Sequence, residues 1–123
     1  MKIGNFDLNK DGVYIIAELS ANHNGSLQTA LDTIKAAKDI GANAIKLQTY
    51  RADTITLNSK KPDFMIDGGT LWDGKNLYEL YEDAYTPWEW HKELFDYARS
   101  INIDIFSTPF DKSAVDFLEQ FNP

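Results

Sequence analysis

Four polar side chains end or interrupt apolar segments of this sequence, and together they suit anion binding and proton transfer. Glu18 follows the apolar run 13–17, and Thr108 follows another apolar stretch. Lys46 and Gln48 alternate with aliphatic residues. A lysine ammonium can bind a phosphate or carboxylate, a threonine hydroxyl can add a hydrogen bond, and a glutamine amide can bond a sugar. A glutamate can move protons, above all if burial raises its pKa.

These four side chains can act together only if three strands lie side by side. Apolar runs predict strands at 13–18, 43–49 and 103–107. Side chains alternate across a strand, so Lys46 and Gln48 share one face while their aliphatic neighbours share the other. If the aliphatic faces pack on helices, all four polar side chains point to the opposite side. They then lie near the carboxyl ends of the strands, where α/β proteins hold ligands.

A helix is expected between the first two of these strands. Apolar residues at spacings of three and four predict it over 27–40, with Ser26 or Asn24 as the N-cap. Gly41 stands where a glycine commonly ends a helix. Strand, helix and strand in this order make a βαβ unit, which implies parallel strands and a right-handed crossover.

The segments around this unit are shorter. A strand is predicted at 2–6, and with the polar turn after it a hairpin could cover one end of the sheet. Residues 50–75 form an irregular stretch, of the kind that is usually functional or contains short elements. Trp72 within it is a candidate for stacking on a sugar. A short helix is predicted at 76–83.

Two further helices are predicted from their start signals. Thr86 and Glu89 form a capping-box pattern, with Pro87 at the first helical position. Asp111 is expected to cap a last helix at 112–121. Strands and helices therefore alternate along the chain, which predicts an α/β fold with parallel strands.

Composition limits the class of protein. The chain has 123 residues, 43% hydrophobic and 25% charged, which is ordinary for one modest globular domain. Its net charge of −7 argues against a nucleic acid or an anionic membrane as partner. There are no cysteines, and no apolar run approaches the ~20 residues of a membrane span. Without a secretory signal pattern, a cytoplasmic location is expected.

Each candidate site residue also has a structural alternative. Glu18 and Lys46 could form a buried salt bridge between neighbouring strands. Thr108 also fits a turn that leads into a helix. His23 is expected to bond its own turn, with a metal or proton-transfer role left open, and His91 is expected on the surface or partly packed. Because the two histidines lack the spacing of a metal pair, no complete metal site is expected within this chain.

Several segments in combination resemble the N-terminal part of the sialic acid synthase family. They are Ile15–Ser26 (IIAELSANHNGS), Ala44–Tyr50 (AIKLQTY) and Phe106–Phe110 (FSTPF). The segments 69–81 (GTLWDGKNLYELY) and 86–91 (TPWEWH) look most like the pseudaminic acid synthase branch. No single motif is specific, but the similarity covers essentially the whole chain.

The resemblance implies an activity and roles for residues. Members of this family condense phosphoenolpyruvate with a 2-acetamido sugar into a nine-carbon 2-keto acid. They combine a TIM barrel with a small antifreeze-like domain and act as homodimers with a divalent metal such as manganese. By resemblance, Glu18 matches the catalytic glutamate, Lys46 and Thr108 match phosphoenolpyruvate-binding positions, and Gln48 matches a sugar-contacting one.

The resemblance also implies that the chain is part of a larger domain. Residues 1–123 would be about three β/α units of an eight-unit TIM barrel. The metal-binding histidines, further phosphoenolpyruvate ligands and the antifreeze-like domain are then expected beyond Pro123. Three parallel strands cannot close a barrel, so a product of this length is expected to self-associate and to lack synthase activity alone.

Other functions stay open. The enzyme could be an N-acetylneuraminate or legionaminate synthase, although residues 64–76 do not match the N-acetylneuraminate-type loop. It could be another phosphoenolpyruvate-using barrel, such as a 3-deoxy-keto-acid synthase, which the loop Asn22–Gly25 and the segment 71–72 disfavour. A different class is a non-catalytic half-barrel module that binds an anion or a partner chain.

Overall fold

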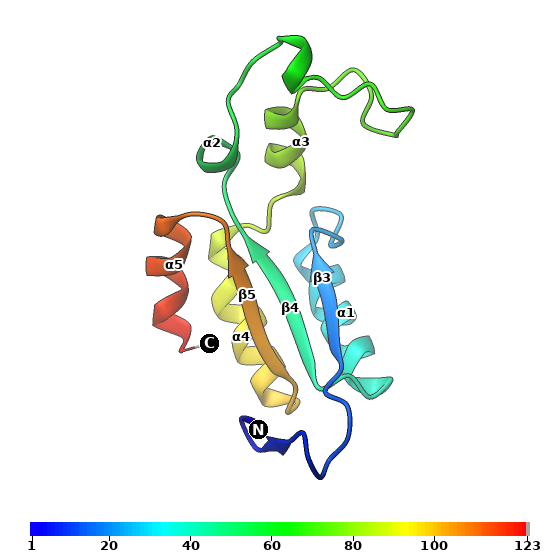
Figure 1. Cartoon of the computed structure of the whole chain (residues 1–123), viewed down its shortest axis with the longest axis vertical. Coiled ribbons are helices and arrows are strands. Elements are labelled where there is room, and N and C mark those ends of the chain that lie inside the picture. Colours follow the sequence, from blue (N-terminus) through cyan, green and yellow to red (C-terminus); the bar gives the residue numbers. More distant parts are fainter. Residues whose placement is uncertain (123) are drawn as a thin grey trace.

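The computed structural model describes residues 1–122, and a three-stranded parallel sheet lies at its centre. The strands are β3 (Ile16–Ser20), β4 (Ala44–Thr49) and β5 (Asp104–Pro109), in that order across the sheet (Figure 1). Both strand pairs are parallel, which confirms the predicted arrangement. The first strand begins three residues later than predicted, because the stretch that contains Val13 lies exposed before the sheet.

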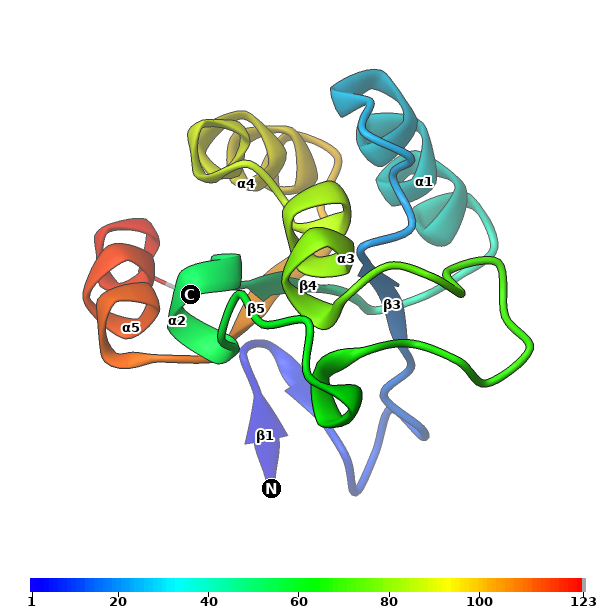
Figure 2. The ribbon, with the colours of Figure 1, turned by 90° about the horizontal axis from the view of Figure 1, so that it is seen from above.

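Helices cover one face of this sheet. α1 (Leu27–Asp39) joins β3 to β4, and α4 (His91–Ser100) precedes β5. Figure 2 shows both on the same side of the sheet, with α5 (Lys112–Leu118) beside β5; α5 continues into the 3-10 turn η3 (Glu119–Phe121). Burial of apolar side chains between these layers is the main stabilising contribution. The fully buried members of this core are Leu19, Ala30, Ile34, Ile45, Leu47, Leu94, Phe95 and Ala98.

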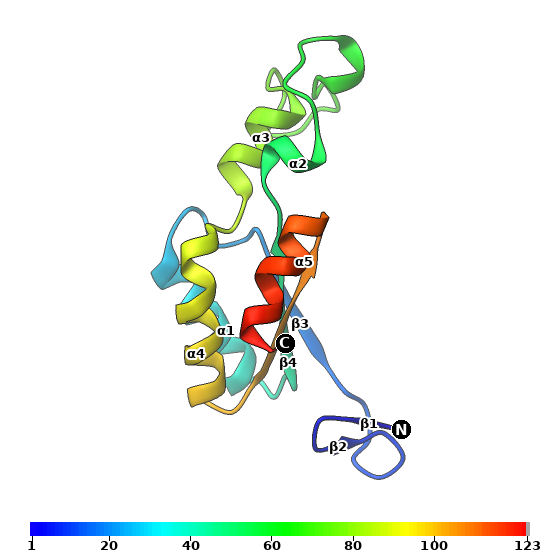
Figure 3. The ribbon, with the colours of Figure 1, turned by 90° about the vertical axis from the view of Figure 1, so that its left-hand side faces the viewer.

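A small hairpin lies at the amino-terminal end of the sheet. Its strands are β1 (Lys2–Ile3) and β2 (Phe6–Asp7), which pair antiparallel. The single strand predicted here is therefore wrong, because Gly4 turns the chain with a φ of 54°. Figure 3 shows the hairpin on the side opposite α1 and α4, and Phe6 packs edge-on against Tyr14 with ring centroids 5.2 Å apart.

The connection from β4 to α4 extends beyond the carboxyl ends of the strands (Figures 1 and 3). It contains α2 (Ala52–Ile55), the 3-10 turn η1 (Pro62–Phe64) and α3 (Leu77–Ala84). Asn76 caps α3, so the predicted helix is confirmed to within one residue at each end. The irregular stretch seen in the sequence thus contains short elements, as expected.

The predicted capping box at the start of α4 is wrong. A 3-10 turn, η2 (Trp88–Trp90), precedes the helix, which begins at His91. The Thr86 hydroxyl donates instead to the backbone carbonyl of Ser20, at 3.5 Å. Thr86 therefore makes a tertiary hydrogen bond in place of the helix cap that the local pattern predicted.

The start of α5 depends on Asp111, as predicted. Its Oδ1 atom accepts hydrogen bonds from the backbone N–H of Ser113 at 2.7 Å and of Ala114 at 3.2 Å. We expect Asp111→Ala to lower the free energy of unfolding by about 1 kcal/mol, measured by urea titration. Asp116→Ala removes an exposed carboxylate from the same helix and should change stability by less than about 0.5 kcal/mol. Equal losses in the two variants would contradict the capping role.

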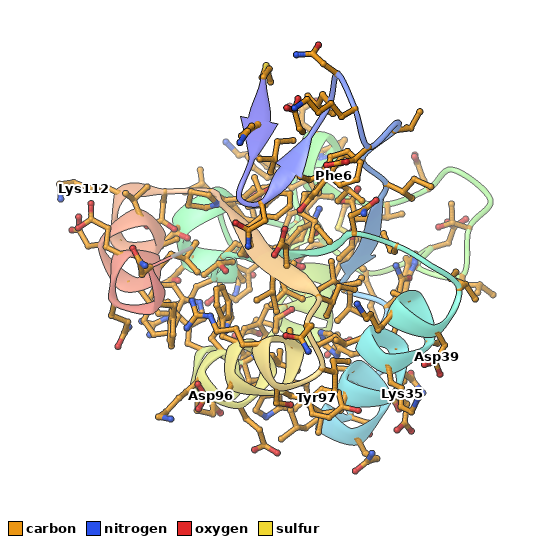
Figure 4. The ribbon with its side chains drawn as sticks, turned by 90° about the horizontal axis from the view of Figure 1, so that it is seen from below. Phe6, Lys35, Asp39, Asp96, Tyr97 and Lys112 are labelled. Carbon is orange, nitrogen blue, oxygen red and sulfur yellow. The ribbon has the colours of Figure 1, made fainter. Side chains whose placement is uncertain are left out.

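Charged side chains lie on the outer surfaces of the helices. Lys35 pairs with Asp39 on α1, and Lys92 pairs with Asp96 on α4, all with largely exposed side chains. Lys35, Asp39 and Asp96 point away from the sheet (Figure 4). Exposed pairs of this kind contribute little to stability, so they form a solvated surface. Among the helices of residues 1–122, none combines the length and apolar character that a membrane crossing requires.

Candidate functional site

The sheet face opposite α1 and α4 carries the four candidate site residues, and we call it the open face. The alternation is confirmed on β4, where the neighbours Ile45, Leu47 and Thr49 are buried, and Leu19 on β3 and Ser107 on β5 are buried in the same way. The open face consists of Ile16, Glu18, Lys46, Gln48, Phe106 and Thr108.

Glu18 and Lys46 form an ion pair on the open face. They are register neighbours on β3 and β4, and the distance from Glu18 Oε2 to Lys46 Nζ is 3.2 Å. The Glu18 side chain is 45% exposed and that of Lys46 is 30% exposed. Within residues 1–122 the pair is therefore partly exposed rather than buried. A pair this exposed adds little stability, and both groups are accessible to a ligand.

Hydrogen bonds, rather than burial, set the protonation of Glu18. The Ser20 hydroxyl donates to Glu18 Oε1 at 2.9 Å. This bond, followed by that from Lys46, lowers the pKa of the Glu18 carboxyl. Within residues 1–122 the side chain is exposed, so the condition under which burial would raise this pKa is not met there. Glu18 is therefore ionised at neutral pH, as a proton acceptor must be.

A bulge at the end of β3 brings Ser20 into this position. The strand register shifts between Glu18 and Ser20, so that Ser20 pairs with Leu47 of β4. Ser20 has a φ of 51°, in the left-handed region that few non-glycine residues adopt. Bulges of this kind commonly redirect a side chain beside an active site.

Gln48 and Thr108 form a second row on the open face. They are register neighbours on β4 and β5, one row nearer the carboxyl ends than Lys46 and Phe106. Neighbouring strands lie about 4.8 Å apart, so the amide and the hydroxyl can contact one ligand. The structure thus brings all four predicted residues to the same face and the same end of the sheet.

A cavity of about 760 Å³ lies beside this end of the sheet, a volume within the usual range of small-molecule sites. It separates the loop that follows β3 from α3. Trp72 forms part of its wall and is 42% exposed, so its ring is accessible. Other lining residues include Asn22, Asn24, Tyr50 and Tyr81. This position fits the role of stacking on a sugar, which the sequence left open for Trp72.

Both histidines are buried and bonded to protein groups. His23 Nδ1 accepts a hydrogen bond from the backbone N–H of Gly25 at 3.1 Å, which confirms the turn-bonding prediction. His91 is fully buried, so the prediction of a surface or partly packed residue is wrong. Burial lowers the pKa of both imidazoles. Within residues 1–122, no group of three or more histidine, aspartate or glutamate residues is placed to hold a metal ion.

Known proteins have sequences similar to this one. The NeuB family model matches residues 33–123. The chain is 59% identical over 123 residues to the pseudaminic acid synthase of Campylobacter jejuni subsp. jejuni serotype O:2, covering 100% of this chain and 35% of that protein. It is 37% identical over 106 residues to the N,N'-diacetyllegionaminic acid synthase of Legionella pneumophila subsp. pneumophila, covering 85% of this chain and 29% of that protein.

A solved structure shares the fold. The crystal structure of N-acetylneuraminic acid (sialic acid) synthetase from Leptospira borgpetersenii serovar Hardjo-bovis, in complex with citrate, matches with a TM-score of 0.75 and 28% identity. The match covers 98% of this chain and 38% of that one. The chain therefore spans about a third of the length of these relatives, 35% of the C. jejuni protein. The expected fold, the first β/α units of a TIM barrel, is confirmed.

Proposed function

Because the chain belongs to the NeuB family, we propose that it forms the first three β/α units of a synthase that condenses phosphoenolpyruvate with a 2-acetamido sugar. The product is a nine-carbon 2-keto acid of the pseudaminic acid type. The observation that carries this proposal is the convergence of Glu18, Lys46, Gln48 and Thr108 on the open face. The 59% identity to a pseudaminic acid synthase supports the choice of sugar.

Each side chain has a role that its chemistry supports. The Lys46 ammonium and the Thr108 hydroxyl bind the phosphate or carboxylate of phosphoenolpyruvate. The Gln48 amide bonds a hydroxyl or acetamido group of the sugar. Glu18, ionised and bonded to Lys46, accepts a proton beside the bound anion.

The proposed reaction balances with these roles. A carbon–carbon bond forms between C3 of phosphoenolpyruvate and the carbonyl carbon of the open-chain sugar, whose oxygen becomes a hydroxyl. Water adds at C2, the C2–O bond to the phosphate breaks, and inorganic phosphate leaves as the new ketone forms. Glu18 accepts one proton of this water and passes it to the sugar oxygen, while the other proton leaves with the phosphate. The Lys46 ammonium stabilises the charge of the bound phosphoenolpyruvate.

A divalent metal of the manganese type, a homodimer and an antifreeze-like domain also belong to this proposal. Residues 1–122 do not fit a metal site by themselves, because no suitable group of ligands is present among them. The proposed metal would therefore use ligands outside this segment, and no step given above depends on it. Phosphoenolpyruvate is a cytoplasmic metabolite, so the proposal also implies a cytoplasmic reaction.

The test is an assay of the protein expressed from the complete reading frame that contains these residues. Each assay contains phosphoenolpyruvate, manganese and one of three acetamido sugars. These sugars are the precursors of pseudaminic, N,N'-diacetyllegionaminic and N-acetylneuraminic acids. We expect the pseudaminic acid precursor to give the highest kcat/KM. A preference for the second sugar would favour the legionaminate candidate, which the 37% identity to such a synthase supports. Anion binding without product from any sugar would favour a non-catalytic module.

A further inference from the structure

Buried hydrogen bonds link β4, β5 and the start of α4 on the helix side of the sheet. The distance from Thr49 Oγ1 to His91 Nε2 is 2.7 Å, and from Thr49 Oγ1 to Ser107 Oγ it is 2.6 Å. His91 Nδ1 lies 3.2 Å from the carbonyl oxygen of Pro87. Thr49 and His91 are both fully buried, and Ser107 is 9% exposed.

The donors and acceptors in this network can be assigned. A carbonyl oxygen only accepts, so His91 Nδ1 donates to Pro87. Burial lowers the pKa of His91, which is therefore neutral at pH 7, and its Nε2 atom is an acceptor. Thr49 then donates to His91 Nε2 and accepts from the Ser107 hydroxyl. Every polar side-chain atom in the network has a partner.

The segment 86–91 also contacts the strand ends at two further points. The Thr86 hydroxyl donates to the Ser20 carbonyl at the end of β3. The Trp88 indole N–H donates to the carbonyl of Tyr50, just after β4, at 3.2 Å. Together with the His91 network, this segment reaches the carboxyl ends of all three strands. We call it the strap, residues 86–91.

The strap lies directly behind the proposed site. Thr49 follows Gln48 on β4, and Ser107 precedes Thr108 on β5, while Gln48 and Thr108 are themselves register neighbours. Because side chains alternate, the network fixes the strands from one face while the site residues project from the other. A shift of Thr49 or Ser107 would therefore move Gln48 and Thr108.

The polarity of this network needs an explanation that packing does not supply. Thr49 and Ser107 occupy inward positions of a parallel sheet that valine or isoleucine commonly fill, and there they require a hydrogen-bond partner for each buried polar atom. The His91 ring also packs against Phe117, with centroids 5.1 Å apart, in an apolar setting that strengthens its hydrogen bonds. The backbone ladder fixes the register of β4 and β5, and the directional side-chain bonds add a constraint on the exact position of the two strand ends.

We propose that His91, through Thr49 and Ser107, is a positioning residue that sets the relative placement of Gln48 and Thr108. The inference rests on the proposed function, because it gives these two residues a common ligand. His91 itself touches neither substrate. Its contribution is to fix the exact position of the carboxyl ends of β4 and β5, where the ligand binds.

Matched pairs of variants in the complete protein test this role. Thr49→Val keeps the shape of the side chain but removes both hydrogen bonds, whereas Thr49→Ser retains the hydroxyl. His91→Gln keeps an acceptor within reach of Thr49, whereas the shorter His91→Asn reaches only Pro87. We expect Thr49→Val and His91→Asn to lower kcat/KM about tenfold, and the conservative partners to retain it within about threefold. If the larger changes prevent folding, Ser107→Ala replaces them in the test. It removes one hydroxyl, and we expect it to lower kcat/KM by a smaller factor.

All variants would be assayed well below their melting temperatures, with the fold verified by circular dichroism. Amide resonances of Gln48 and Thr108, recorded without substrate, give a second readout that is independent of turnover. They should shift in His91→Asn but not in His91→Gln, because His91 is distant from both residues in the sequence and reaches them only through Thr49 and Ser107. Lower melting temperatures with unchanged kcat/KM and unchanged resonances would make the network merely structural and overturn the proposal. An inactive wild-type protein would instead overturn the proposed function, and the resonances would still decide the positioning role.

Discussion

Glu18→Gln is expected to slow formation of the 2-keto acid about 10²–10⁴-fold in the complete protein, the usual contribution of a positioned acid or base. Glutamine keeps the size of the side chain but cannot accept the proton. Binding of phosphoenolpyruvate should be retained or become tighter, because Lys46 loses the carboxylate with which it is now paired. Initial rates of product formation and a separate binding titration would measure the two effects.

Glu93→Gln is the matched control for this change. Glu93 is exposed on α4, on the far side of the sheet from the open face, and its replacement should leave the rate unchanged. A Glu18→Gln enzyme as fast as the wild type would mean that Glu18 only pairs with Lys46. In that case the open face would still bind an anion, but it would contribute no proton acceptor.

Lys46→Met is expected to raise the KM for phosphoenolpyruvate by about 10- to 100-fold, the effect of losing a hydrogen bond to a charged group. Methionine preserves the length and apolar stem of the side chain, so the sheet should fold normally. The KM for the sugar should change little, because Gln48 remains in place. Steady-state kinetics with each substrate varied in turn would separate the two.

The same variant should change the pH dependence of the reaction. Lys46 is one of the groups that lower the pKa of Glu18, after Ser20, so this pKa should rise in Lys46→Met. A proton acceptor is lost as the pH falls through its pKa, and the acid limb of the rate profile should therefore move to higher pH. Lys35→Met, which removes an exposed lysine from α1, should move neither the KM nor the profile. Equal effects of both variants would indicate a general loss of positive charge rather than a site.

The sheet and its polar face were predictable because strand alternation is local information. The positions of Lys46, Gln48 and Thr108 followed from the period of two, and Gly41 correctly ended α1 with a φ of 92°. The protonation of Glu18 was not predictable in this way. It depends on the Ser20 hydroxyl, which a bulge redirects, and a bulge leaves no mark in the apolar pattern.

The strap was missed for a related reason. Thr86 looked like a helix cap, but its partner is the carbonyl of Ser20, 66 residues earlier in the sequence. For His91 a sequence signal did exist, because Leu94, Phe95 and Ala98 lie three, four and seven residues after it and form the buried side of α4. A histidine in that stripe should have been assigned to the core.

The most direct test of the account is to map phosphoenolpyruvate on the complete protein by amide chemical shifts. We predict that the largest changes fall at Lys46, Gln48 and Thr108 at the carboxyl ends of β4 and β5, and that Lys46→Met abolishes them at the same ligand concentration. Changes confined to other surfaces, such as the one around Lys112 of α5, or a Lys46→Met spectrum that responds like the wild type, would contradict the account.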